Sequence, residues 1–139
     1  NYCYYLEKAK LYADSPQEVM SDELLEKFIH DYIAAQTMPQ VLFTWHGGET
    51  LMRPLSFYKR VVELQKKHAN GHTIDNCIQT NGTLLTDEWC EFFRRENWLV
   101  GVSIDGPHWL WLTILMQTIR WIFTTSLKKL VVITSSLHR

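Results

Sequence analysis

The spacing of hydrophobic residues changes several times along the chain. Between residues 21 and 36 apolar side chains recur at helical spacing, and Ser21 is a suitable N-cap for a helix that Met38-Pro39 would end. Residues 41–45 form a short apolar run of strand-forming residues, which is typical of a strand buried on both faces. This part of the pattern predicts a helix followed by a buried strand.

The alternation of helix and strand then repeats twice. A helix is predicted at 55–68, a strand at 73–79, a further helix after the N-cap Thr86, and a strand at 99–104. Strands separated by helices of this length indicate parallel βαβ units with right-handed crossovers. Each strand ends in a polar motif that contains glycine, and parallel sheets and barrels carry their sites at this edge. We therefore expect an α/β fold with an enzyme-like site at the carboxyl ends of the strands.

Composition narrows the class of protein. The 139 residues are 46% hydrophobic and 21% charged, as in a soluble globular domain or a part of one. A net charge of −1 predicts no nucleic acid and no membrane as partner, because such partners usually require a clustered basic surplus. Three cysteines at irregular spacing, and an N-terminal stretch unlike a signal peptide, predict a cytoplasmic location.

Charge and patterning change together near residue 107. All 15 acidic residues lie at or before Asp105, whereas residues 108–139 carry four Lys or Arg and no acid. The alternation of strands and helices also stops there, although a helix followed by a strand at 129–134 is a second interpretation. We expect residues 1–107 to be a partial core and residues 108–139 to be an atypical tail, out of frame or otherwise non-native.

Four motifs carry the candidate chemistry. In chain order they are Tyr2-Cys3-Tyr4-Tyr5-Leu6-Glu7-Lys8, Trp45-His46-Gly47-Gly48-Glu49, Gln79-Thr80-Asn81-Gly82-Thr83-Leu84-Leu85 and Ser103-Ile104-Asp105-Gly106-Pro107. Together they resemble the anaerobic sulfatase-maturating enzymes, a branch of the radical S-adenosylmethionine (SAM) superfamily. The resemblance covers residues 1–107. It implies a segment of a partial (βα)6 TIM-like barrel with parallel strands, whose first strand would precede Asn1 and whose later units are missing or replaced.

The resemblance implies two cofactors, a 4Fe-4S cluster and S-adenosyl-L-methionine. Cys3 would be the third thiolate ligand of the cluster, and Tyr2 would lie against the adenine end of SAM. The exposed backbone of Gly47-Gly48-Glu49 would bind the SAM amino group, which requires a close approach that glycine allows. The hydroxyl of Ser103 would bind the SAM ribose or carboxylate.

Other residues are candidates for the wall of the substrate or SAM cavity: Tyr5, Gln79, Thr80, Asn81 and Asp105. Gln79 is expected to point into the barrel, and Asp105 to hold the turn that follows the last strand. For Asn81 the alternative is an ordinary Asn-Gly turn.

Four more residues have weaker interpretations. Thr50 stands where the family usually has proline, and we expect this departure to make the glycine loop less rigid. His46 is expected to be a hydrogen-bonded structural histidine, with proton transfer as the alternative. Cys77 and Cys90 have no metal-ligand spacing, so they are assigned to core packing.

The resemblance also implies a reaction. The parent enzyme would cleave SAM reductively to methionine and a 5′-deoxyadenosyl radical, which takes a hydrogen atom from Cβ of a cysteine or serine in a sulfatase polypeptide. Oxidation would then give Cα-formylglycine, with an electron donor such as ferredoxin or flavodoxin and with a general base outside this chain. The alternatives are another peptide-modifying radical SAM enzyme, such as one that matures a ribosomal peptide, or a catalytically dead α/β segment. An α/β-hydrolase is disfavoured because Asp105 stands where a nucleophile elbow needs glycine.

Overall fold

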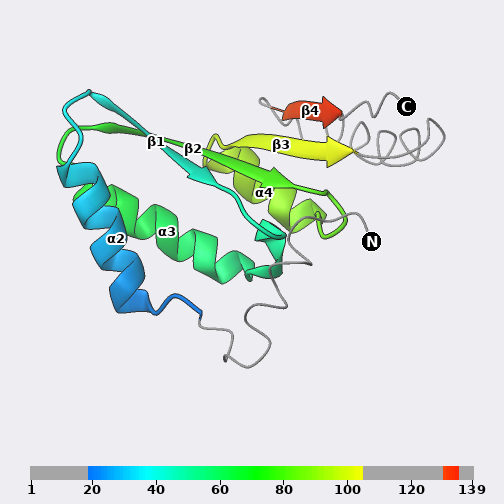
Figure 1. Ribbon diagram of the computed structural model, residues 1–139, viewed down its shortest axis with the longest axis horizontal. Coiled ribbons are helices and arrows are strands. Elements are labelled where there is room, and N and C mark those ends of the chain that lie inside the picture. Colours follow the sequence, from blue (N-terminus) through cyan, green and yellow to red (C-terminus); the bar gives the residue numbers. More distant parts are fainter. Residues whose placement is uncertain (1–18, 105–129, 135–139) are drawn as a thin grey trace.

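The computed structural model describes residues 19–104 and 130–134, so the predictions made for Tyr2, Cys3, Tyr5 and Asp105 lie outside the described residues. Four parallel strands form one sheet in the order β1-β2-β3-β4 (Figure 1). The elements in chain order are α2 (Asp22–Ala34), β1 (Gln40–Trp45), the 3₁₀ turn η2 (Thr50–Met52), α3 (Leu55–His68), β2 (Thr73–Thr80), α4 (Asp87–Arg95), β3 (Leu99–Ile104) and β4 (Leu130–Thr134). The predicted α/β class with parallel strands is confirmed.

Local chemistry explains where the helices begin and end. The Ser21 hydroxyl accepts a hydrogen bond from the backbone of Leu24 at 3.2 Å, and Thr86 caps α4 in the same way. After α3 the chain turns through Asn70 and Gly71, which both have positive φ. The predicted helices are therefore confirmed, with bounds that differ from the expected ones by two residues or fewer.

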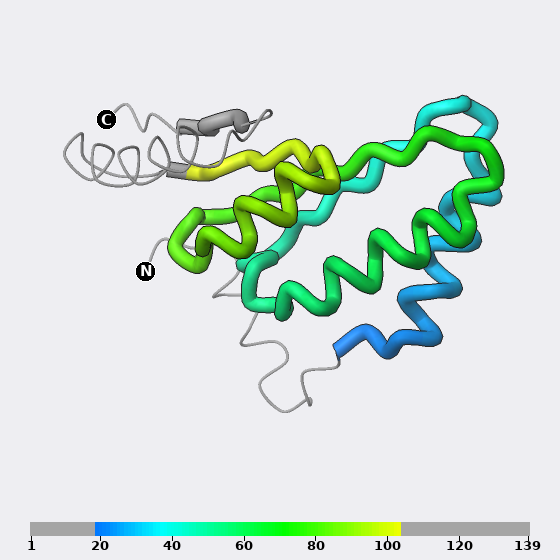
Figure 2. The backbone as a smooth tube through the Cα atoms, turned by 180° about the vertical axis from the view of Figure 1, so that it is seen from behind, coloured from blue at the N-terminus to red at the C-terminus, as the bar shows by residue number. Residues whose placement is uncertain are grey.

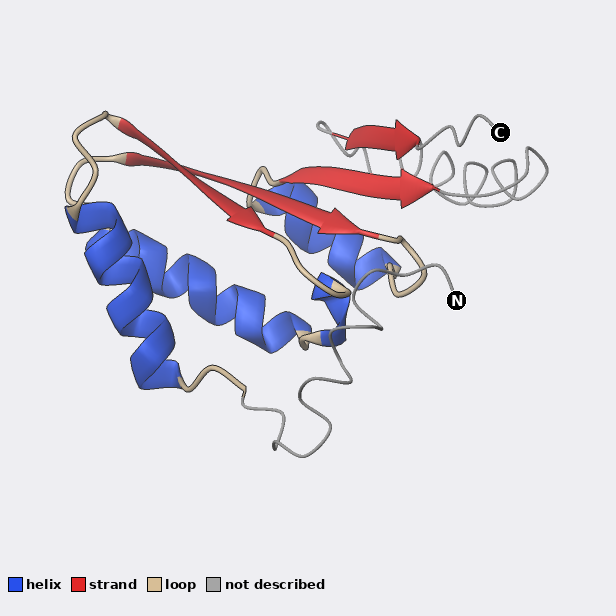
Figure 3. Ribbon diagram, in the orientation of Figure 1, coloured by secondary structure: helices blue, strands red, loops and turns tan. Residues whose placement is uncertain are grey.

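Only one face of the sheet is covered by helices in the part of the chain that the structure describes (Figure 3). In β1, Val41 and Phe43 point toward the helices and are buried, whereas Leu42 between them is 53% exposed. The prediction that this strand is buried on both faces is wrong, because a parallel strand is buried twice only where a second layer covers the sheet. We call the face that carries Leu42, Cys77 and Gln79 the open face.

A polar network lies inside the core between α3 and β2. The Asn76 and Gln65 side chains exchange two hydrogen bonds, of 2.9 and 2.8 Å, and Asn76 Oδ1 also accepts one from Trp45 Nε1 at 2.9 Å. Both amides are buried, at 7% and 3% exposed. Their mutual pairing satisfies groups that would be costly to bury alone.

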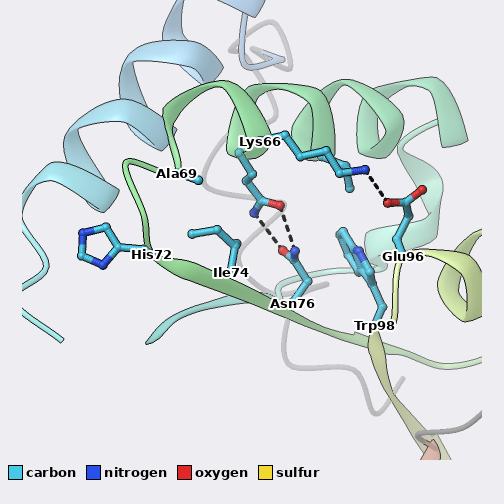
Figure 4. A pocket seen from close by; sticks show the side chains of 9 residues that line it. Lys66, Ala69, His72, Ile74, Asn76, Glu96 and Trp98 are labelled. Carbon is cyan, nitrogen blue, oxygen red and sulfur yellow. Dashed lines mark hydrogen bonds and ion pairs between the residues drawn. The ribbon is translucent and has the colours of Figure 1, made fainter. Parts of the chain in front are cut away.

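This network borders a cavity of about 230 Å³ at the amino ends of β2 and β3, which Figure 4 shows with Asn76, Trp98 and the Lys66–Glu96 ion pair around it. Nε1 of Trp98 is buried there without a hydrogen-bond partner among the described residues. The cavity lies at the end of the sheet opposite the glycine motifs, so it is separate from the site that the sequence predicts.

Replacing Asn76 by alanine should destabilise the fold strongly. The substitution leaves the buried Gln65 amide and Trp45 Nε1 without their partner, and we expect a loss of about 3 kcal/mol in the free energy of unfolding. Urea unfolding followed by tryptophan fluorescence measures the change. As a control, Gln40→Ala removes an exposed amide that donates to the Asp75 carboxylate, and because this carboxylate stays accessible to water the variant should change stability by at most about 1 kcal/mol. Equal effects for the two variants would contradict the assigned network.

Part of the predicted tail belongs to the sheet. Strand β4 pairs in parallel with β3, from Val100↔Leu130 to Ile104↔Thr134. The second interpretation of the tail, with a strand at 129–134, agrees with this pairing. The boundary at residue 107 and the non-native origin of residues 108–139 stay predictions. Among the described residues, no helix is long and apolar enough to cross a membrane.

Candidate functional site

Two loops leave the carboxyl ends of neighbouring strands and lie at one edge of the sheet. The first is residues 46–49 after β1, and the second is residues 81–86 after β2, next to the end of β3 (Figure 2). Parallel pairing sets this arrangement, because Trp45 is opposite Ile78 and Thr80 is opposite Val102. The motifs that are far apart in sequence are therefore neighbours in space.

Two glycines of the first loop have backbone conformations that other residues rarely adopt. Gly47 has φ of 114° and Gly48 has φ of 52°, and both are exposed. Among the described residues, a Cβ added to either glycine would meet nothing within 4 Å. The protein itself thus requires glycine for the backbone angle, and the space beside the backbone stays open to a ligand. The close approach of SAM to this backbone stays a prediction.

Glu49 uses both carboxylate oxygens within the protein. Oε1 accepts hydrogen bonds from the Leu51 backbone at 3.0 Å and from the Thr80 hydroxyl at 2.6 Å, and Oε2 accepts one from the Asn81 backbone at 2.9 Å. The side chain therefore joins the glycine loop to the end of β2. Sequence reasoning placed Glu49 in a cofactor motif but did not find these partners.

Thr50 links the glycine loop to the end of β2, whereas the sequence predicted only that it makes the loop less rigid. It is 7% exposed, and its hydroxyl donates a hydrogen bond of 2.7 Å to the Gln79 carbonyl. Its own carbonyl accepts a bond of 2.8 Å from the Tyr58 hydroxyl. Burial raises the pKa of Tyr58 to about 12, so this phenol keeps its proton at neutral pH and continues to donate. A proline at this position would lack the hydroxyl and could not make this bond. The expectation that Thr50 makes the loop less rigid did not take this hydrogen bond into account.

Gln79 and Ser103 meet on the open face. Gln79 Nε2 donates a hydrogen bond of 2.5 Å to Ser103 Oγ, and both side chains are half-buried. Gly101 lies opposite Gln79, and a Cβ there would meet Gln79 Oε1 at 2.3 Å. The glycine therefore leaves the space through which the Gln79 side chain reaches Ser103. Gln79 faces away from the helices, as expected for a residue that points into a barrel.

Adding a methyl group at Gly101 should separate this pair. In Gly101→Ala the flexible end of Gln79 must move, so we expect the Gln79–Ser103 hydrogen bond to break with a stability change of at most about 1 kcal/mol. A crystal structure of the variant, together with its thermal unfolding, checks both statements. In the double variant with Gln79→Ala the space is restored and stability should recover. A Gln79 side chain that stays in place in Gly101→Ala would refute the proposed steric role.

The second loop is organised by its own side chains. The Thr80 hydroxyl, on a residue that is 3% exposed, donates to Glu49 and accepts from the Gly82 backbone at 3.1 Å. Asn81 Oδ1 accepts from the backbone and the hydroxyl of Thr83, at 2.9 and 2.7 Å. The loop thus has the turn chemistry of the Asn-Gly alternative. Contacts of Thr80 and Asn81 with substrate or SAM stay predictions.

The two described cysteines differ in environment. Cys90 is fully buried in α4, and burial raises the pKa of its thiol to about 11, so its assignment to core packing is confirmed. For Cys77 that assignment is wrong, because it is half-buried on the open face and its thiol donates to Thr44 Oγ1 at 3.5 Å. Residues 19–104 and 130–134 contain no group of three His, Cys, Asp or Glu side chains that could hold a metal ion.

A parallel sheet with helices on one face and a glycine loop at its carboxyl edge is the arrangement found in one segment of an α/β barrel, a class of protein that builds its sites at this edge. The family model described as "Radical SAM superfamily" matches residues 1–125. The chain therefore belongs to the radical SAM superfamily.

Curated relatives refine the resemblance. The chain is 83% identical over 106 residues to a serine-type anaerobic sulfatase-maturating enzyme of Bacteroides thetaiotaomicron. The matched region is 76% of this chain and 26% of the relative. It is 35% identical over 107 residues to a cysteine-type enzyme of Clostridium perfringens, and this match covers 76% of the chain and 29% of the relative. The predicted resemblance is confirmed, and the chain spans about a quarter of the length of the curated relatives it matches.

Solved structures agree with the fold. The structure of native anSMEcpe with bound AdoMet and the Kp18Cys peptide has a TM-score of 0.78 and 25% identity, and the match covers 95% of this chain and 38% of that one. The structure of native anSMEcpe with bound AdoMet has a TM-score of 0.74 and 26% identity, and the match covers 84% of this chain and 35% of that one. The prediction of a radical SAM barrel segment is confirmed.

Proposed function

We propose that this chain is part of an anaerobic sulfatase-maturating enzyme that oxidises a serine of a sulfatase to Cα-formylglycine. The observation that carries the proposal is the 83% identity to a serine-type enzyme, against 35% to a cysteine-type enzyme over nearly the same length. The serine target goes beyond the motifs, which are compatible with either residue.

Two regions of the chain, together with Ser103, would hold the cofactors. Cys3 would supply one of the three thiolates that bind a 4Fe-4S cluster, with Tyr2 beside the SAM adenine. The open space beside Gly47 and Gly48 fits a ligand placed against the loop backbone. When bound, the reduced cluster would supply the electron that cleaves SAM to methionine and a 5′-deoxyadenosyl radical.

Ser103 is equipped to bind an oxygen of SAM. Because its Oγ accepts the hydrogen bond from Gln79, the hydroxyl hydrogen is available to donate to a ribose or carboxylate oxygen. Gln79 would thus orient the hydroxyl, and Gly101 would leave room for Gln79 to do so. Asp105 would hold the turn after β3.

The substrate would be a sulfatase polypeptide that approaches the open face. A solved structural neighbour contains a bound peptide, which supports a peptide substrate. An electron donor such as ferredoxin or flavodoxin would reduce the cluster before SAM is cleaved. The 5′-deoxyadenosyl radical would take one hydrogen atom from serine, a general base outside this chain would take the hydroxyl proton, and the remaining electron would pass to an iron–sulfur or flavin acceptor. A cytoplasmic location with its reducing conditions would suit these thiolate and cluster chemistries.

Anaerobic reconstitution of the full-length protein with iron and sulfide tests the cofactors, with an expected absorbance near ~400 nm from a cysteine-ligated cluster. Mass spectrometry of a co-expressed sulfatase tests the reaction, with the expected loss of two hydrogens at the target serine. A colourless protein that does not bind SAM would refute the radical SAM function. A protein that cleaves SAM but leaves the sulfatase unchanged would favour another peptide substrate.

A further inference from the structure

Two consecutive residues, Glu49 and Thr50, connect the glycine loop to the end of β2. The Glu49 carboxylate accepts hydrogen bonds from Thr80 and Asn81, and the Thr50 hydroxyl donates to the carbonyl of Gln79. The three partners are consecutive in sequence, so the loop is attached along the whole end of the neighbouring strand. Bonds to a carboxylate are stronger than those between neutral groups, and Thr50 makes its bond where it is buried.

Gln79 extends this connection to the next strand. Its backbone carbonyl accepts from Thr50, while its side chain donates to Ser103 on β3. A continuous set of hydrogen bonds therefore runs from the loop after β1, through the end of β2, to the end of β3. The glycine backbone and the Ser103 hydroxyl are held in one frame.

We propose that Glu49 and Thr50 are positioning residues that hold the Gly47-Gly48 backbone in place relative to Ser103 before a ligand binds. The inference rests on the proposed function, in which these glycines and Ser103 bind SAM. Two adjacent glycines lose much conformational entropy when a ligand orders them, and a loop that is already fixed avoids this cost. Glu49 thus acts through the loop, with its carboxylate bound by the protein.

The first test measures SAM affinity in the reconstituted full-length protein. Thr50→Val removes the hydroxyl at nearly constant volume and should weaken SAM binding about tenfold, as expected for one buried hydrogen bond, with turnover at saturating SAM little changed. Thr50→Ser keeps the hydroxyl and should restore affinity to within about threefold of wild type. Thr73→Val changes an exposed threonine at the opposite end of β2 and should leave affinity unchanged.

The second test measures hydrogen exchange in the protein without cofactors. The backbone amides of Leu51, Met52 and Arg53 lie in or directly after η2 and are hydrogen-bonded to Glu49 and Thr50, so they report whether the residues that anchor the loop stay fixed. Exchange of these amides should be about tenfold faster in Thr50→Val and Glu49→Gln, and unchanged in Thr73→Val.

The two tests separate the possible outcomes. If the amides exchange hydrogen at the wild-type rate in Thr50→Val and Glu49→Gln, the positioning role is overturned. It is also overturned if these amides exchange faster in Thr50→Val but the SAM affinity of this variant is unchanged. A wild-type protein that binds no SAM would refute the proposed function, while faster exchange in both variants would still support the positioning of the loop. Recovery in Thr50→Ser, together with weaker binding in Thr50→Val, supports both.

Discussion

Replacing Cys3 by alanine in the full-length protein is expected to abolish formylglycine formation. A cluster of this type needs each of its protein thiolates, and alanine cannot bind iron. We expect iron and sulfide content to fall, absorbance near ~400 nm to be lost, and sulfatase modification to drop to background. Iron analysis, the absorption spectrum and mass spectrometry of the co-expressed sulfatase measure the three effects.

The control for Cys3 is Cys77, which is half-buried on the open face. Cys77→Ser keeps a group that can donate to Thr44, and it should leave iron content and the absorbance of the cluster at wild-type values. A Cys3→Ala protein with full iron content would exclude Cys3 as a ligand. Loss of the cluster in both variants would indicate a general effect of cysteine replacement instead.

The helices and strands of this chain could be predicted because their signals are local. Ser21 and Thr86 mark helix starts, and Asn70-Gly71 marks a helix end, each within a few residues of the element it bounds. The exposure of Leu42 was not predictable in the same way, since it depends on whether another layer covers the sheet. The position of Cys77 on the open face could have been inferred from its alternation with the buried Ile78.

The hydrogen bonds of the site depend on strand register, which the sequence pattern does not specify. Glu49 meets Thr80 only because Trp45 is opposite Ile78. Gly101 offered one usable signal, since a glycine inside a strand often marks a close approach. That the approaching group is the Gln79 side chain follows only from the pairing of β2 with β3. Motif order thus predicted which strand ends form the site, and the register determines which side chains join them.

Replacing Gly47 by alanine should weaken SAM binding more than any change at Thr50. With φ of 114°, an alanine at this position carries a strain of roughly 1–3 kcal/mol, although its methyl group meets no atom of residues 19–104 or 130–134 within 4 Å. If the loop relaxes to relieve this strain, SAM can bind only after the original backbone conformation is restored, and the strain energy is then subtracted from the binding free energy. We therefore expect SAM affinity to fall by about 10- to 100-fold, as measured by equilibrium dialysis with the reconstituted full-length protein.

Gly71 provides a closely matched control. It has φ of 88°, and no atom in the described part of the chain lies within 4 Å of an added Cβ. It follows α3, at the opposite end of the sheet from the glycine loop. Gly71→Ala should therefore lower thermal stability through the same kind of strain and leave SAM affinity unchanged. Weaker SAM binding in Gly47→Ala alone would locate the ligand at the loop after β1. Wild-type SAM affinity in Gly47→Ala would remove Gly47 from the binding site. An equal loss of affinity in the two variants would attribute the loss to backbone strain in general, because both positions have positive φ.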